Sequence, residues 1–242
     1  MEVHHHSHTS RKKWTHYFWE FLMLFLAVTL GFFVENQREH YIENHRADQY
    51  AISLLTDMKQ DTSQLANIIE SRTERKYELN RLMDELEKPL NEQDDTVLFR
   101  IGAFEFARRA YFNARTGTYE QIQNSGALRY FPTYLAAQLV DYKANINLLE
   151  KQLDIENKYI IENVINMRSK FCNQKYLRYE QAGKEYVVKE RLISKDHEIQ
   201  SQVYSAINFL LERNEIYLYF LKETKAMSVK LINDLNEKFN LR

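Results

Sequence analysis

Histidine and glutamate side chains cluster at His40, Glu43 and His45, and these residue types are common Zn²⁺ ligands. On a helix His40 and Glu43 share a face, whereas His45 is rotated about 140° away from His40. One metal ion therefore cannot use both histidines, and we predict a solvated helix surface. The histidines at positions 4, 5, 6 and 8 are predicted to form a solvated tail, so no metal site is expected.

Acidic residues that lie close together can do acid–base chemistry, and Asp57, Asp61 and Glu70 form such a set. The chain has 34 acidic residues, so sets of this kind arise by chance. No glycine-rich phosphate loop, GxSxG motif or HExxH motif is present. We therefore predict no enzyme activity, no catalytic residue and no cofactor.

Four arginines near position 118 are the remaining candidates for chemistry. They are Arg108, Arg109, Arg115 and Arg129. At a helix N-terminus they could bind an anion, although exposed surface arginines are the simpler interpretation. The whole chain carries 33 Lys and Arg against 34 Asp and Glu, a net charge of −1, which argues against nucleic acid as a partner.

The glycine and proline content predicts the elements that must hold these residues. Five glycines and two prolines are present, where an average chain of this length would have about 17 and 12. Folds with many tight turns are nearly excluded, and an all-α fold of long helices remains. The single cysteine, Cys172, cannot form an internal disulfide and is predicted to be a small buried residue.

Residues 14–34 form an apolar stretch that predicts a transmembrane helix. As a helix the stretch is about 31 Å long, which is enough to cross a bilayer core of about 30 Å. Trp14, Tyr17 and Trp19 cluster at its N-terminal end, as aromatic anchors do at a membrane interface. The polar composition of the rest of the chain excludes several spans but permits one.

The flanking charges predict the orientation of this helix. Arg11, Lys12 and Lys13 precede it, and residues 35–39 carry no cationic excess. The positive-inside rule makes residues 1–13 a cytoplasmic leader and residues 35–242 an extracytoplasmic domain. No Ala-x-Ala-like site follows the apolar run, which favours an uncleaved signal anchor over a cleaved signal peptide. A buried core helix of a soluble protein is the other alternative.

Apolar residues at alternating spacings of four and three predict long helices beyond residue 34, and hence an elongated antiparallel bundle. The predicted helices are 51–86, into which the membrane helix continues, a shorter one at 96–114, one from 133 to 171 whose spacing slips near Asn157, and one at 196–241. Arg72 and Lys76 fall on the core-facing side of the first. They either extend to solvent, which we favour, or form buried ion pairs.

Two shorter segments carry predictions of their own. Thr118 is predicted to be the N-cap of a short helix, with Gln121 completing a capping box, and Ser125-Gly126 is predicted to supply a left-handed stop. Residues 176–190 lose the helical period, which predicts a small hairpin or an ordered loop.

One element of the chain resembles an uncharacterised family of single-span membrane proteins of Bacteroidota. The residues that carry the likeness are Thr118, Tyr119, Glu120, Ser125 and Gly126, followed by a helix with Leu139, Tyr142 and Leu149. The likeness covers most of residues 15–155 and includes an acidic residue at the start of the span, here Glu20. It implies a single-pass protein of the bacterial inner membrane with a periplasmic C-terminal domain, and it implies no catalytic residue.

Glu20 is the sharpest functional candidate, because a carboxylate within a membrane span is costly. It either extends to the lipid headgroups or pairs with His16 one turn earlier, or it contacts a cation or hydrogen-bond donor on another span, from a copy of this chain or a different protein. The favoured function is a membrane-anchored periplasmic scaffold or accessory subunit whose partners are the lipid bilayer and other envelope membrane proteins or copies of itself. A ligand-sensing periplasmic bundle is the alternative.

Overall fold

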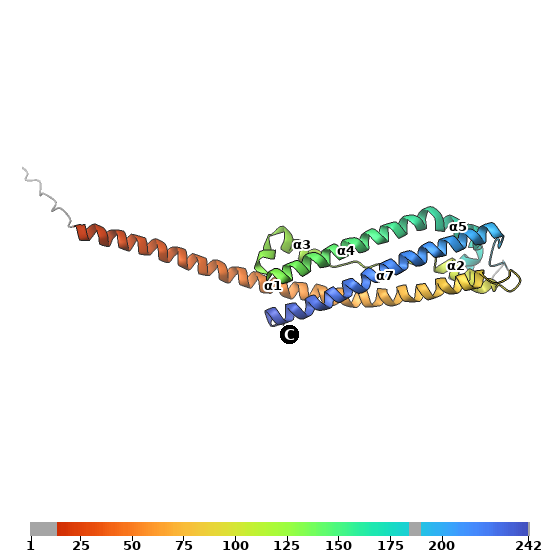
Figure 1. The fold of residues 1–242 in the computed structure, drawn as a ribbon, viewed down its shortest axis with the longest axis horizontal. Helices are drawn as coiled ribbons and strands as arrows, with labels where there is room; N and C mark the ends of the chain where they lie inside the picture. Colours follow the sequence, from red (N-terminus) through yellow and green to blue (C-terminus); the bar gives the residue numbers. More distant parts are fainter. Residues whose placement is uncertain (1–13, 184–189, 242) are drawn as a thin grey trace, which may run out of the picture. The chain divides into compact units, whose positions relative to one another are not determined.

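The computed structural model describes residues 14–183 and 190–241, and every regular element in these two ranges is helical, as predicted (Figure 1). The elements are α1 (Trp14–Leu86), α2 (Asp95–Phe104), α3 (Gly117–Asn124), the 3₁₀ helix η1 (Ala127–Tyr130), α4 (Thr133–Tyr159), the π-helix η2 (Ile160–Val164), α5 (Ile165–Phe171), α6 (Gln174–Ala182) and α7 (His197–Phe239). Residue contacts divide the chain into an N-terminal unit, Met1–Gln49, and a C-terminal unit, Tyr50–Arg242. The two units are described separately below.

The N-terminal unit consists, in its described part, of the first half of α1. Most of its large apolar side chains are exposed, with Phe32 at 74% and Leu24 at 67%. This segment is long and apolar enough to cross a membrane by length and composition, and none of its apolar window is buried. The prediction of a single helix through residues 14–86 is confirmed, because α1 covers that whole range.

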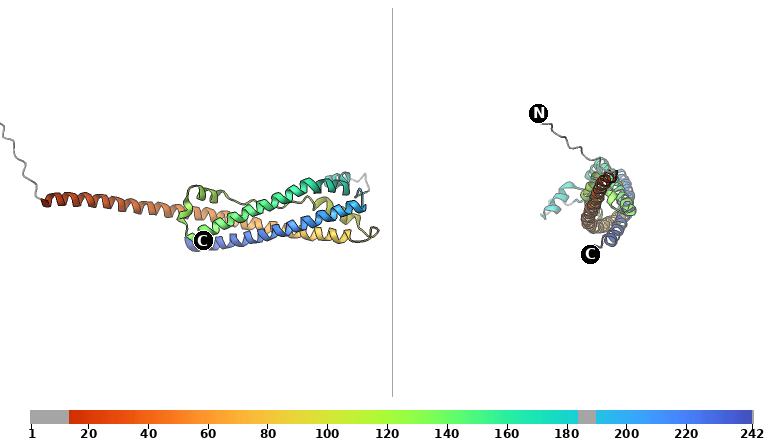
Figure 2. Two further views of the ribbon diagram at one scale, coloured as in Figure 1. Left: turned by 45° about the horizontal axis from the view of Figure 1, so that its top comes forward. Right: turned by 90° about the vertical axis from the view of Figure 1, so that its left-hand side faces the viewer.

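The C-terminal unit buries its apolar residues in two clusters that define how its long helices run. The first cluster joins residues 51–68 of α1, 135–149 of α4 and 217–235 of α7. The second joins residues 79–86 of α1, α2, residues 160–171 and residues 203–210 of α7. Consequently α7 runs opposite to α1 and α4, and α4 and α7 lie side by side (Figures 1 and 2). α1 and α4 run in the same direction, which the antiparallel prediction did not include.

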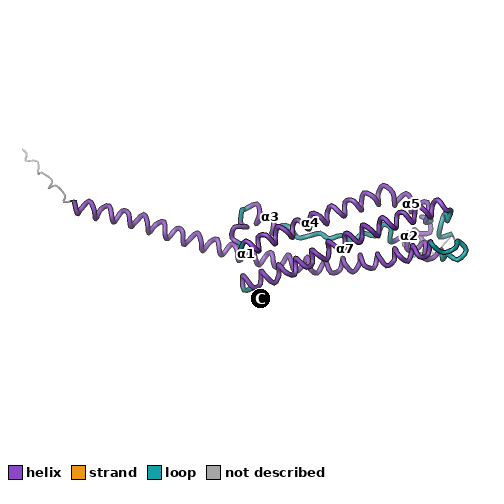
Figure 3. The backbone as a smooth tube through the Cα atoms, in the orientation of Figure 1, coloured by secondary structure: helices purple, strands orange, loops and turns teal. Residues whose placement is uncertain are grey.

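An extended segment explains why α1 and α4 are parallel. The helix predicted at 96–114 ends ten residues early, at Phe104, and residues 108–116 have no regular structure. Figure 3 shows this part of the chain as a loop that runs along the helices between α2 and α3. It returns the chain from the second cluster to the first, so that α4 can start beside the same part of α1 that α3 contacts.

Two irregular places lie in the second half of the chain. The spacing slip near Asn157 corresponds to the π-helix η2, which begins three residues later and contains one extra residue per turn. The small hairpin or ordered loop predicted at 176–190 is wrong in its described part up to Ala182, because these residues belong to α6. The N-cap of α6, Asn173, accepts from the backbone N–H groups of Lys175 and Tyr176. Residues 184–189 lie outside the described residues.

The helix ends follow standard capping chemistry where the sequence offers it. Asp196 accepts from the N–H of Ile199 at 3.0 Å and starts α7 within one residue of the prediction. Gly126 has φ +70°, so the left-handed stop after α3 is confirmed. The capping box at Thr118 is wrong: α3 starts at Gly117 after Thr116, and neither threonine caps it.

Candidate functional site

Two arginines of α1 are completely buried between α4, α7 and the extended segment. Arg72 and Arg75 are each 1% exposed, and both donate to the carboxylate of Glu156 on α4. The Arg72 Nη1 lies 2.8 Å from one Glu156 oxygen, and its guanidinium lies 4.5 Å from the centre of the Tyr217 ring. The expectation that Arg72 extends to solvent is therefore wrong, and the buried ion pair is the correct alternative.

Lys76, the other cation of that prediction, behaves differently from Arg72. Its ammonium group pairs with Glu215 of α7, and both side chains are about half exposed. A pair in that setting is screened by solvent and adds little to stability. Lys76 therefore reaches the surface as expected, whereas Arg72, one turn earlier on α1, does not.

The buried arginines also hold the backbone of the extended segment. The Arg72 Nε donates to the carbonyl of Ala110 at 2.7 Å, and the Arg75 Nε donates to the carbonyl of Glu105 at 3.2 Å. The hydroxyl of Tyr217 accepts from the N–H of Phe112 at 3.1 Å. Beyond the end of α2, these bonds satisfy backbone groups of Glu105, Ala110 and Phe112, because buried backbone groups need a partner.

The charges in this cluster shift one another's ionisation. Burial alone would raise the pKa of Glu156, but the guanidinium groups of Arg72 and Arg75 outweigh it and hold that pKa below its ordinary value. Burial raises the pKa of the Tyr217 phenol. The carboxylate of Glu156 is therefore ionised in the neutral range, and the cluster acts as a fixed structural joint between three parts of the chain.

The element at residues 118–126 is fastened to α1 by two carboxylates. The Thr118 hydroxyl donates to Asp57 at 2.5 Å, and the backbone N–H of Arg115 donates to Asp61 at 3.1 Å. Asp61 is 1% exposed and also accepts from the Tyr142 hydroxyl at 2.7 Å. Asp57 and Asp61 therefore act as acceptors for neighbouring segments, which is a structural role.

The other members of this element have separate positions. Tyr119 is buried in the first apolar cluster, Glu120 lies 3.8 Å from Lys143 of α4, and Ser125 is the C-cap of α3. The element therefore connects the extended segment to α4 and holds this connection against α1. The third acid of the sequence set, Glu70, lies apart from the other two on an open groove.

Replacing Asp61 by asparagine should change how stability depends on pH. Burial raises the pKa of Asp61, so the folded chain holds this proton more tightly than the unfolded chain. Its contribution is complete below the unfolded pKa and is lost as pH rises through the raised folded pKa. Asp61→Asn keeps an oxygen for the Arg115 N–H and carries no charge. We expect the melting temperature of the variant, relative to the wild type, to rise with pH through the acidic range.

Thermal unfolding of both proteins across that range measures this difference. Groups shared by both chains cancel in the comparison. Asp84→Asn, at an exposed position of α1, is the matched control and should show no such trend. A difference that stays flat with pH for Asp61→Asn would contradict the burial of its charge.

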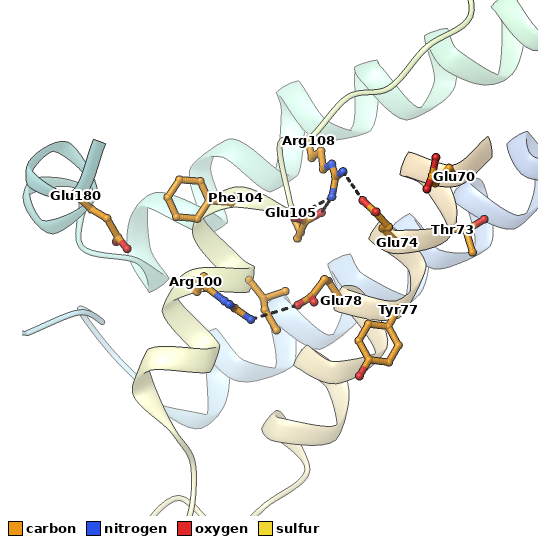
Figure 4. Close-up of a pocket in the computed structure, with 11 residues that line it drawn as sticks. Glu70, Thr73, Glu74, Tyr77, Glu78, Arg100, Phe104, Glu105, Arg108 and Glu180 are labelled. Atoms are coloured by element: carbon orange, nitrogen blue, oxygen red, sulfur yellow. Dashed lines mark hydrogen bonds and ion pairs between the residues drawn. The ribbon is translucent and has the colours of Figure 1, made fainter. Parts of the chain in front are cut away.

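A groove opens on the C-terminal unit between α1, α2 and α6 (Figure 4). Its lining residues are Glu70, Thr73, Glu74, Tyr77, Glu78, Arg100, Ile101, Phe104, Glu105, Arg108 and Glu180. Arg108 contacts Glu74 at 3.0 Å and Glu105 at 3.4 Å, and Arg100 lies 3.8 Å from Glu78. Of the four arginines considered as an anion site, Arg108 is thus occupied by glutamates in this groove.

The remaining arginines of that set are spread over separate places. The backbone of Arg115 contacts Asp61, the guanidinium of Arg129 lies 4.9 Å from the centre of the Tyr130 ring, and Arg109 is exposed. The structure does not bring the four together, so the proposed anion site is not formed.

Cys172 is completely buried beside α2. Burial raises the pKa of its thiol to about 12, so it remains protonated in the neutral range. A Cβ atom at Gly102 would lie 3.2 Å from the Cys172 sulfur and 3.1 Å from the Phe171 ring, which explains the glycine there. The prediction of a buried, structural cysteine is confirmed.

The predicted anchor residues lie on the exposed surface of α1 in the N-terminal unit. Trp14 is 81% exposed, Trp19 61% and Tyr17 56%. Glu20 lies 3.1 Å from the Nε2 of His16, one turn earlier, which is the local pairing considered from the sequence. His40 lies 3.9 Å from Glu43. Among the residues that the structure describes, no group of three or more potential ligands could hold a metal ion.

Comparison with known proteins finds no family model, no curated protein and no solved structure that matches this chain. The features on which a function can be argued are an exposed apolar helical segment in one unit and, in the other, a helical core with a buried Arg–Glu–Arg cluster and an acidic groove.

Sequence reasoning missed Arg75, Glu156 and the groove. Glu156 is one residue from the spacing slip at Asn157, and Arg75 lies three residues after Arg72, so both share a helix face with buried neighbours. A charged residue in register with an apolar face was the available signal.

Proposed function

We propose that this protein is a membrane-anchored scaffold or accessory subunit of the bacterial cell envelope. Residues 14–34 would cross the inner membrane with residues 1–13 in the cytoplasm, and residues 35–242 would form a periplasmic helical bundle that contacts other membrane proteins. The proposed function depends on contacts with other proteins, because the buried charged side chains of the C-terminal unit bind backbone groups of that unit itself.

One contrast between the two units carries the proposal. In the C-terminal unit the apolar face of every long helix is buried, as shown by Leu65, Leu135 and Leu221 at 0% exposure. In the N-terminal unit large apolar side chains such as Phe32 are exposed on all sides of α1. A continuous exposed apolar surface of this kind marks contact with a membrane or with another protein. Its length, its aromatic end and the preceding cations support a membrane.

Cysteine labelling in intact cells tests the predicted topology. The variants Ser10→Cys and Lys238→Cys place a thiol in the N-terminal leader and at an exposed position near the end of α7. We expect a membrane-impermeant maleimide to label Lys238→Cys once the outer membrane is opened, and Ser10→Cys only after the inner membrane is lysed. Because Cys172 is buried, the unmodified protein provides the background. Labelling of Ser10→Cys alone from outside would show the opposite orientation.

Affinity purification of the full chain from native membranes, followed by mass spectrometry, tests the scaffold function. We expect one or more envelope membrane proteins to be enriched over an unrelated single-span bait of similar abundance. A chain that purifies without any enriched protein and without further copies of itself would overturn the proposal. A tightly bound small molecule in place of a protein would favour the ligand-sensing alternative.

A further inference from the structure

The acidic groove of Figure 4 gathers carboxylates from three separate parts of the C-terminal unit. Glu70, Glu74 and Glu78 come from α1, Glu105 directly follows α2, and Glu180 comes from α6. Together with Arg100 and Arg108 on the same lining, these residues give the groove a net charge of −3. A concave surface of this charge attracts cationic groups.

The two arginines of the groove show how it pairs with a cation. Arg108 lies 3.0 Å from Glu74 and 3.4 Å from Glu105, so its guanidinium contacts carboxylates from two different elements. Arg100 lies 3.8 Å from Glu78. Cationic side chains thus already occupy the middle of the groove, and three of its five carboxylates are paired with them.

Two carboxylates of the groove have no cationic partner within the described part of the chain. They are Glu70 and Glu180, and both are exposed. Figure 4 shows them at opposite ends of the groove, one on α1 and the other on α6. No group of three or more potential ligands among the described residues could hold a metal ion. An occupant that satisfies both ends therefore carries two separate organic cations.

Aromatic surface is exposed on the same lining. Tyr77 is 64% exposed and Phe104 is 37% exposed. The groove has a volume of about 910 Å³, which lies in the range of sites that hold organic ligands rather than single ions. Exposed rings of this kind lose contact with water when an apolar side chain covers them, and they also accept a cation over the ring face.

We propose that the acidic groove is the docking site for a basic segment of a partner envelope protein, in which two Lys or Arg side chains flank an apolar one. The inference deepens the proposed scaffold function, on which it rests, by naming the surface and the chemistry of the partner. The cations of the segment pair with Glu70 and Glu180, and its apolar side chain covers the rings of Tyr77 and Phe104. Opposite charges steer and orient such a contact, while the apolar surface supplies the area that becomes buried.

A protein segment fits this combination better than a small polyamine does. A polyamine offers cations but no side chain that covers the exposed rings. A segment of a protein carries cationic and apolar side chains along one backbone, so it satisfies both features of the groove in one contact.

Peptide binding to the full chain in nanodiscs of zwitterionic lipid tests the chemistry. The probes are fluorescent, amidated peptides with two arginines separated by leucines, in a series of increasing length, and fluorescence anisotropy measures their affinity. We expect at least one member to bind, and high salt to weaken it, because both glutamates are exposed. The same peptide with glutamate in place of arginine should not bind, and serine in place of leucine should weaken binding.

Substitutions in the groove locate the bound peptide. Glu70→Gln with Glu180→Gln should lower its affinity roughly fivefold, since each exposed ion pair contributes little. Glu150→Gln with Glu223→Gln, at exposed positions of α4 and α7 outside the groove, is the matched control and should leave the affinity unchanged.

Charge reversal provides a second readout that does not depend on a small loss. Glu70→Lys with Glu180→Lys should abolish binding of the arginine peptide and create binding of the glutamate peptide, since opposite charges are required across the contact. Equal affinity of the wild type and the reversed variant for the arginine peptide would overturn the proposal. Displacement of the peptide by spermidine at an equal concentration would also overturn it, in favour of a small polyamine.

Crosslinking in native membranes identifies the natural segment. A photoreactive group is attached to Thr73→Cys in the groove, and the crosslinked stretch of the partner is mapped by mass spectrometry. We expect a stretch in which basic residues flank an apolar one. Ala137→Cys, at an exposed position of α4 outside the groove, is the matched control and should not capture that stretch. An acidic or uncharged stretch at Thr73→Cys, or equal capture by both variants, would overturn the proposal.

The results separate this inference from the proposed function. If the arginine peptides do not bind while envelope proteins still co-purify with the chain, the scaffold function stands and the groove is not its docking site. Absence of any enriched protein in the affinity purification, by contrast, overturns the scaffold function itself.

Discussion

Replacement of Glu156 by glutamine is expected to lower the free energy of unfolding by about 3–5 kcal/mol, because it leaves two buried guanidinium groups without a counter-charge. Arg72 and Arg75 are each 1% exposed and cannot reach solvent without disturbing the core. Glutamine has nearly the same shape as glutamate, so the loss is one of charge rather than of packing. It also weakens the hold of both arginines on the carbonyls of Ala110 and Glu105.

Denaturant unfolding of the full chain in mild detergent, followed by circular dichroism, measures the loss. Glu150→Gln, at an exposed position on the same helix, is the matched control and should change stability by less than about 0.5 kcal/mol. The pKa of Glu156 is lowered in the folded chain, so its contribution is present above the unfolded pKa and disappears as pH falls through the folded pKa. The wild type and Glu156→Gln should therefore converge in strong acid. Equal stability of the wild type and Glu156→Gln near neutral pH would contradict a buried ion cluster.

The long helices could be predicted from the sequence because local and tertiary signals agree in them. In α7 the core-facing spacing continues from Val203 to Leu235 with polar residues at only three positions, the N-cap Asp196 marks its start, and the helix ends within two residues of the expected position. The first part of α1 was equally clear, since its apolar run is followed by a long stretch of helical spacing, and one helix covers both.

The extended segment could not be predicted in this way, because its structure depends on distant residues. Residues 105–114 contain aromatic side chains at helical spacing, which indicated a continued helix. The arginines of α1 and the Tyr217 hydroxyl provide partners for its backbone instead, so the helical hydrogen bonds are not needed. Thr118 failed as a cap for the same reason, since its hydroxyl donates to Asp57, sixty-one residues earlier.

The groove between α1, α2 and α6 could likewise not be predicted from the sequence alone. Glu70, Glu105 and Glu180 are far apart in the sequence, and only the meeting of α1, α2 and α6 brings them around one groove.

An arginine at the centre of the apolar segment should abolish stable membrane integration. Leu24 lies near the middle of residues 14–34 and is 67% exposed, so its side chain would face lipid. A leucine at mid-span favours insertion slightly, whereas an arginine there opposes it, and the exchange costs about 3–4 kcal/mol. Since each 1.4 kcal/mol is a factor of ten, Leu24→Arg should reduce the ratio of integrated to non-integrated chain by more than about a hundredfold.

The measurement is the fraction of full-length protein that stays in the membrane pellet after alkaline carbonate extraction. Leu90→Arg makes the same exchange at an exposed leucine, 56% accessible, of the C-terminal unit and should leave that fraction unchanged. If Leu24→Arg remained in the pellet as fully as Leu90→Arg, the exposed apolar surface of α1 would have to be covered by protein rather than lipid. The segment would then be a protein–protein interface, and Lys238→Cys should not show the labelling expected of an extracytoplasmic position.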